Sequence, residues 1–88
     1  MTRIELVDYL LKQNYVQENR GLYSKVYEMA QGVGNVPGNL VTIQYRINKD
    51  ILSVYYVLVH KKVKRFKAKI KNISIGSDNE LIGLTIIK

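Results

Sequence analysis

The 88-residue sequence has no cysteine, no tryptophan and only one proline. Without cysteine, the chain has no disulfide framework, no zinc site built from thiolates and no thiol nucleophile. The longest uninterrupted apolar run, 54–59, is far too short to cross a bilayer, and the first residues lack the apolar core of a signal peptide. We therefore expect a soluble, cytoplasmic protein that does not use a membrane.

Catalytic chemistry also has few residues available to it. Any Ser-His-Asp constellation would have to use His60, the only histidine, and nothing around it suggests a partner. Neighbouring cations disfavour an imidazolium there, so we interpret His60 as a residue at the end of a strand. The seven acidic residues are scattered, without paired carboxylates or the spacing of a zinc or calcium site. The sequence thus predicts a protein that is not an enzyme and holds no metal or cofactor.

The N-terminal segment has the pattern of an amphipathic helix. Thr2 and Glu5 have the spacing of a capping box, and Asp8 and Lys12 have the spacing of an i, i+4 ion pair. Apolar residues cover about half of the helical surface, at Ile4, Leu6, Val7, Leu10 and Leu11. We predict a helix over 3–14 whose apolar side packs on the rest of a single small domain, residues 1–88.

Residues 22–30 fit a helix or a strand, because their apolar side chains recur at helical spacing while Tyr23 and Tyr27 would line one face of a strand. The aromatic residues and the preceding Gly21 favour the strand. Residues 31–39 hold three glycines and the sole proline, which predicts a loop. This loop lacks the Gly-Lys-Ser/Thr ending of a phosphate-binding loop, so we interpret it as a connector.

Two further strands follow the loop. Residues 40–47 alternate between apolar and polar, and residues 51–60 are apolar on both faces, as in a central strand. A three-residue turn at 48–50 would make the two strands a hairpin and pair Ile47 with Ile51. The central strand would then turn back at its far end onto a third strand.

A two-residue turn at 61–62 would place Val57 opposite Phe66 and Tyr55 opposite Ala68. Both predicted registers give the same pair of faces. The face suited to cover by the helix would carry Val41, Ile43, Tyr45, Ile51, Tyr55, Val57, Phe66, Ala68 and Ile70. The other face would carry Thr42, Gln44, Arg46, Leu52, Val54, Tyr56, Leu58, Arg65, Lys67, Lys69 and Lys71.

Near the C-terminus the apolar parity changes, which predicts a bulge or bend around Asn72. Residues 76–79 have turn composition, and residues 81–87 are predicted to form a last strand. The sequence as a whole predicts an α+β fold with an N-terminal helix packed on an antiparallel sheet of four or five strands.

The positive charge is concentrated in residues 61–71, which hold seven of the fourteen lysine and arginine residues. No acidic residue lies between Asp50 and Asp78, so the net charge of +7 belongs to this stretch. Cations at alternate positions of a strand share one face, about 6.6 Å apart, and can follow a run of phosphates while Tyr56 stacks on a base. This pattern predicts a nucleic-acid-binding face formed by Arg46, Tyr56, Lys61, Lys62, Lys64, Arg65, Lys67, Lys69 and Lys71.

The same concentration of charge has other interpretations. A basic face also suits docking to an acidic protein surface, as in interaction or assembly proteins of phages and mobile elements. Lysines on a strand can instead serve only to keep an outer face solvated and unpaired. Residues 61–65 also match a basic nuclear-import pattern. The predicted partner is therefore DNA, RNA or an acidic protein, and the oligomeric state stays open.

A series of short motifs lies within residues 21–45: Gly-Leu-Tyr-Ser-Lys-Val at 21–26, Gly-Val-Gly at 32–34, Pro37, and Val-Thr-Ile-Gln-Tyr at 41–45. This series resembles the opening of FKBP-type peptidyl-prolyl isomerase domains. The chain lacks the Phe-Asp pair, the Gly-Trp pocket floor and the Ala-Tyr-Gly loop of that family. The resemblance implies an antiparallel sheet with a helix against it and, as a third alternative, a reduced FKBP-like domain; it carries over no catalytic residue.

Overall fold

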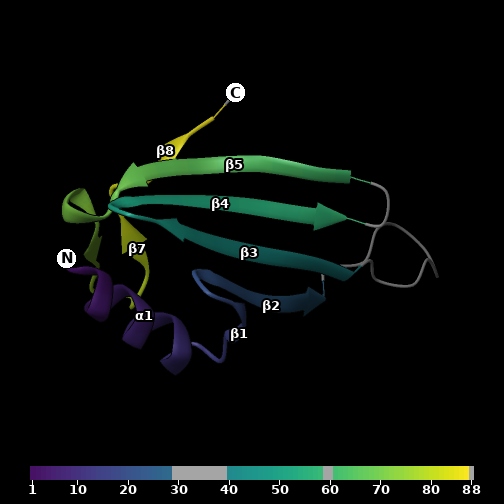
Figure 1. The fold of residues 1–88 in the computed structure, drawn as a ribbon, viewed down its shortest axis with the longest axis horizontal. Helices are drawn as coiled ribbons and strands as arrows, with labels where there is room; N and C mark the ends of the chain where they lie inside the picture. The colour runs from purple at the N-terminus through teal and green to yellow at the C-terminus, as the bar shows by residue number, and fades with distance from the viewer. Residues whose placement is uncertain (29–39, 59–60, 88) are drawn as a thin grey trace.

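The computed structural model describes residues 1–28, 40–58 and 61–87. Its elements are α1 (Arg3–Lys12), β1 (Val16–Asn19), β2 (Leu22–Glu28), β3 (Leu40–Asn48), β4 (Ile51–Leu58), β5 (Lys61–Lys69), the 3-10 helix η1 (Ile70–Asn72), β6 (Ser74–Ile75), β7 (Leu81–Ile82) and β8 (Thr85–Ile86). An antiparallel sheet of six strands has the order β1-β2-β3-β4-β5-β8, and β6 pairs separately with β7 (Figure 1). The predicted α+β class is confirmed, and the sheet has more strands than predicted.

The helix begins as its sequence predicts. The Thr2 side chain accepts a hydrogen bond from the Glu5 backbone N–H at 3.2 Å, and the Glu5 carboxylate accepts one from the Thr2 N–H at 2.9 Å. Asp8 and Lys12 form the expected ion pair at 2.9 Å. The helix ends at Lys12 rather than at residue 14, because Asn14 takes a left-handed conformation with φ 68° that turns the chain away.

β1 is a strand that its sequence did not predict, because its four residues are exposed and show no alternation. It pairs with β2 across a turn in which Gly21 has φ 75°, and a Cβ there would lie 2.6 Å from the Ile47 carbonyl oxygen. The predicted strand at 22–30 is confirmed over 22–28. Its last two residues, the predicted loop at 31–39 and the predicted strand end at His60 lie outside the described residues.

The turn between β3 and β4 has two residues instead of the predicted three. Asn48 lies opposite Ile51, and Lys49 in the turn has φ 57°. Ile47 therefore pairs with Leu52, and the predicted Ile47–Ile51 pair is wrong. A shift of one residue turns over every side chain of a strand, so β4 presents the opposite face from the predicted one.

The predicted turn at 61–62 is also wrong, because both residues belong to β5. In place of the predicted Val57–Phe66 and Tyr55–Ala68 pairs, the sheet has Val54–Phe66, Leu52–Ala68 and Val57–Lys62. Arg65 has no partner residue in β4, because the register shifts by one between Lys64 and Phe66. This bulge places Arg65 and Phe66 on the same side of the sheet.

The strands β3, β4 and β5 thus have two faces of different composition. The helix face is formed by Val41, Ile43, Tyr45, Ile47, Leu52, Val54, Tyr56, Leu58, Val63, Phe66 and Ala68. The open face is formed by Thr42, Gln44, Arg46, Ile51, Ser53, Tyr55, Val57, Lys62, Lys64, Lys67 and Lys69. α1 packs on the helix face.

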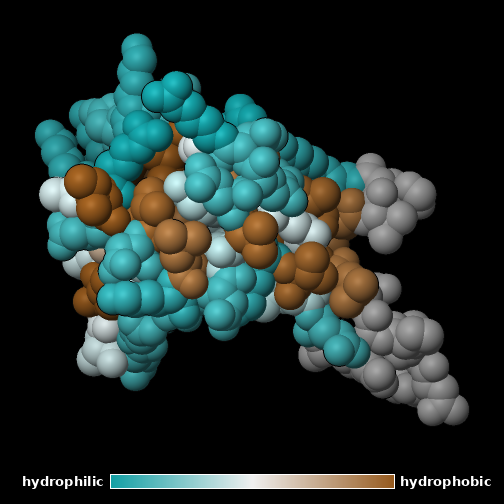
Figure 2. Space-filling model, turned by 60° about the horizontal axis from the view of Figure 1, so that its bottom comes forward, coloured by the Kyte–Doolittle hydropathy of each residue, from teal (hydrophilic) through white to brown (hydrophobic). Residues whose placement is uncertain are grey.

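The core lies between α1 and one end of the helix face. Leu6 and Leu10 are fully buried there together with Leu52 and Val54. The predicted apolar side of the helix is wrong in part, because Ile4 is 81% exposed and Leu11 is 51% exposed. Figure 2 shows exposed apolar groups as separate patches among hydrophilic surface on the side of α1, β1 and β2.

Tyrosines extend this core along the sheet. The Tyr15 ring stands edge-on to the Tyr45 ring, with centroids 5.0 Å apart, and its hydroxyl lies 3.0 Å from the Tyr27 hydroxyl. Burial raises the pKa of Tyr45 to about 12 and raises the pKa of Tyr15 as well. Both phenols therefore stay neutral to a higher pH than an exposed tyrosine does.

The C-terminal segment changes direction at η1 and again in the turn at 76–79. The change of parity predicted around Asn72 takes the form of η1, and the predicted turn at 76–79 is confirmed, with the Asn79 N–H donating to the Gly76 carbonyl at 3.0 Å. The predicted strand at 81–87 is divided at Gly83, which has φ 100° and packs against the Asn72 carbonyl. Within the described ranges, no helix has the length and apolarity of a membrane crossing.

Candidate nucleic-acid interface

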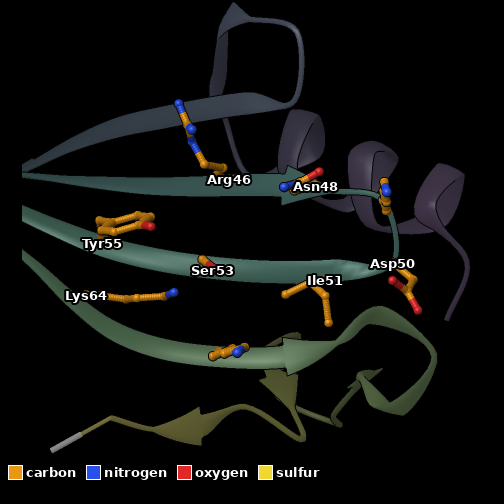
Figure 3. A pocket seen from close by; sticks show the side chains of 9 residues that line it. Arg46, Asn48, Asp50, Ile51, Ser53, Tyr55 and Lys64 are labelled. Carbon is orange, nitrogen blue, oxygen red and sulfur yellow. The ribbon is translucent and has the colours of Figure 1, made fainter.

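A hollow of about 440 Å³ lies on the open face over β3, β4 and β5 (Figure 3). Ser53 and Tyr55 of β4 lie along its middle, with Arg46 of β3 on one side and Lys64 of β5 on the other. The small Ser53 side chain, which is buried, leaves room between the longer side chains of the neighbouring strands. The remaining lining residues are Asn48, Lys49, Asp50, Ile51 and Lys67.

The hollow is strongly basic. Arg46, Lys49, Lys64 and Lys67 line it, against a single acidic residue, Asp50. The ion pair in the described part of the chain joins Asp8 and Lys12 of α1, so none of the lining cations there is neutralised by a salt bridge. Residues 29–39 and 59–60 contain no Asp or Glu that could change this count. The open face therefore presents uncompensated positive charge.

One aromatic ring stands among these cations. The Lys62 ammonium lies 4.6 Å from the centroid of the Tyr55 ring, and the Lys64 ammonium lies 5.9 Å from it. Tyr55 is half-buried, so part of its ring surface is accessible. Lysine side chains reach the ring by rotation about flexible bonds, and an anionic ligand can draw them away.

The structure divides the predicted site residues between two faces. Arg46, Lys67 and Lys69 lie together on the open face, as the alternation predicted, and the register adds Lys62 and Lys64 to that face. Tyr56, Lys61 and Arg65 lie on the helix face, where they line a second hollow, and Lys71 belongs to η1. The predicted single face that joined Tyr56 and Arg65 to Lys67 and Lys69 is therefore wrong.

Two local features cause this division. The two-residue turn at Lys49 exchanges Tyr56 for Tyr55 on the basic face, and the bulge at Arg65 moves that side chain to the helix face. The Arg65 guanidinium accordingly lies 5.7 Å from the Tyr56 ring centroid. The turn sequence Asn48-Lys49-Asp50 suits either a two- or a three-residue turn. The bulge in β5 does leave a signal in the sequence, because the apolar parity changes between Val63 and Phe66, across the adjacent cations Lys64 and Arg65.

The sequence did not identify Tyr55 and Lys49 as part of the basic face. The pairing register of β3 and β4 places Tyr55 on the basic face, and the two-residue turn places Lys49 at the edge of the hollow. Among the described residues, no three His, Cys, Asp or Glu side chains gather as metal ligands would. No protein-family model, curated protein or solved structure that was compared with the chain matches it.

Proposed function

We propose that this protein binds nucleic acid through the open face, with no catalytic role. The observation that carries the proposal is the set of cations from β3, β5 and the turn at Lys49, which form no salt bridge with the described residues and surround one accessible aromatic ring of β4. Phosphate contacts supply most of the affinity of such a surface, because each contact releases a condensed counterion.

The spacing of the cations suits a phosphate backbone. Lys62 and Lys64 are alternate residues of β5, and so are Lys67 and Lys69, which places each pair about 6.6 Å apart. Arg46 reaches the same hollow from β3 and offers a planar group that can bind a phosphate through two hydrogen bonds. The strand β5 and the turn at Lys49 thus border a track for the backbone.

Tyr55 suits a base of a single strand. A base that stacks on its ring would displace the Lys62 ammonium, which would then be free to contact a phosphate. The proposal therefore favours single-stranded DNA or RNA over duplex, whose bases are already stacked. The reduced FKBP-like domain stays a separate prediction, and the sequence lacks the catalytic motifs of that family.

The test is fluorescence anisotropy of a labelled twelve-nucleotide oligo-dT across a salt series, for the wild type and two double variants. Lys64→Gln with Lys67→Gln removes two cations of the open face. Lys61→Gln with Arg65→Gln removes the same charge from the helix face. If each of the five strand cations of the open face (Arg46, Lys62, Lys64, Lys67 and Lys69) contacts one phosphate, the slope of log K against log salt is about −3.5 on a single strand.

We expect the open-face variant to flatten that slope by about 1.4 units and the helix-face variant to leave it nearly unchanged. Tyr55→Leu should weaken binding by about 1–3 kcal/mol with little change in slope, since stacking releases no ions. Tyr56→Leu is its matched control and should bind like the wild type. Equal flattening by both double variants, or no binding at about 50 mM salt, would show that the open face is not a nucleic-acid site.

A further inference from the structure

The outer edge of β5 is covered only in part. β8 pairs with Phe66 and Lys67, and the Ile87 N–H donates to the Arg65 carbonyl at 2.8 Å. On that side, no strand in the described part of the chain pairs with residues 61–64 (Figure 1). A strand edge of this kind offers backbone N–H and C=O groups for pairing with another extended segment.

An apolar groove of about 260 Å³ lies next to this edge on the helix face. Val41, Tyr56, Leu58 and Val63 line it, with Lys61 and Arg65 at its two ends along β5. Leu58 is 40% exposed. The groove therefore lies at the end of the helix face that α1 does not fill.

The positive charge on the free edge of β5 favours an acidic partner strand over a second copy of the chain. Lys61, Lys62 and Lys64 occupy its free part, and β5 contains no acidic residue. A second copy of the chain that paired edge to edge would bring these lysines together, and like charges on opposed strands are destabilising. The lysines that disfavour edge-to-edge pairing of two copies would attract an acidic strand.

We propose that the free edge of β5 binds an extended acidic segment of another protein as an added strand. Side chains alternate along a strand, so Lys61, Val63 and Arg65 face one side of the added segment at every second position. A segment with an apolar residue between two acidic ones, each separated by one residue, places the apolar side chain over the groove and one acid beside Lys61. The other acid lies where the segment leaves the edge, next to Ile87, and its side chain extends toward Arg65. This edge site uses the helix face and does not depend on nucleic-acid binding at the open face.

The test uses an end-capped, fluorescein-labelled peptide, Ser-Glu-Thr-Ile-Thr-Glu-Ser, with its Glu→Gln and Ile→Ser versions as peptide controls. The protein variants are Lys61→Glu with Arg65→Glu and, as a control of equal charge change, Lys67→Glu with Lys69→Glu on the open face. We expect the edge variant to weaken binding about tenfold or more and the control to change it far less. Both altered peptides should bind weakly.

Amide hydrogen exchange separates strand addition from simple charge attraction. Bound peptide should slow exchange at residues 61–64, because pairing protects backbone N–H groups. Absence of peptide binding, unchanged exchange at 61–64, or equal loss in both protein variants would each overturn the proposal. Concentration-dependent protection of the same amides without peptide would also overturn it, since the occupant would then be a second copy of the chain.

Discussion

The two faces of β4 carry similarly apolar side chains in very different surroundings. Leu52 and Val54 are almost completely buried beneath α1, whereas Tyr55 and Val57, on the other face, are only half-buried and have lysines as neighbours. Both sets are apolar enough to form a core. The difference shows that the hydrophobicity of a central strand does not select which of its faces the helix covers.

What selects the face is the combination of turn length and partners. On β3, Ile47 and Tyr45 lie beside Leu52 and Val54, and on β5, Ala68 and Phe66 complete the same two rows. These rows are apolar across three strands, so a helix that covers them buries a continuous surface. Each row of the open face ends in a lysine of β5, which remains in water.

The largest expected effect comes from the helix that covers one face. Leu10→Ala should destabilise the protein by about 2–5 kcal/mol, because Leu10 is fully buried. Its neighbour is the matched control: Leu11→Ala should change the free energy of unfolding by less than about 0.5 kcal/mol, since Leu11 is exposed. Urea unfolding followed by circular dichroism measures both. Equal losses would mean that α1 presents its other apolar side to the sheet.

Alkaline pH should destabilise the packing of the helix face in particular, because buried phenols lie there. The folded pKa of Tyr45 is raised from 10.0 to about 12, so its stabilising contribution is complete below pH 10 and is lost as the pH rises through 12. Two units correspond to at most about 2.7 kcal/mol. Tyr45→Phe should reduce the fall in unfolding free energy between pH 10 and 12. An unchanged fall in that variant would mean that Tyr45 ionises freely in the folded protein.

The smallest expected effect is a difference between two valines of the same strand. Val54→Ala should cost about 2 kcal/mol, because Val54 is 1% exposed in the core, and Val57→Ala about 1 kcal/mol, because Val57 is half-buried on the open face. Thermal or urea unfolding of the two variants under one condition gives the difference. A larger loss for Val57→Ala than for Val54→Ala would support the register predicted from the sequence, in which Val57 lies beneath the helix.

Local signals predicted much of the fold correctly. The capping box at Thr2 and Glu5, the alternation of β3 and the apolar run of β4 each depend on residues close in sequence, and each gave the right element. The strand β1 was missed because its exposed residues carry no periodic pattern and it forms only by pairing with β2. Pairing of this kind depends on tertiary context.

The candidate site was predicted in its charge and only partly in its geometry. The cluster of cations in β5 follows from composition, and Lys62, Lys64, Lys67 and Lys69 do share one face. The aromatic residue beside them does not follow, because Tyr55 and Tyr56 are adjacent and either one fits an alternating pattern.

By itself, the sequence determined the types of the longer elements and the position of the positive charge, since both arise from residues that are neighbours in the chain. Only the tertiary structure decided which cations lie together on one face of the sheet and which tyrosine lies among them. One residue fewer in the turn at Lys49 and one residue more at Arg65 reverse the side chains that follow them. The physical reason is the two-residue period of a strand, which turns a shift of one position into a change of face.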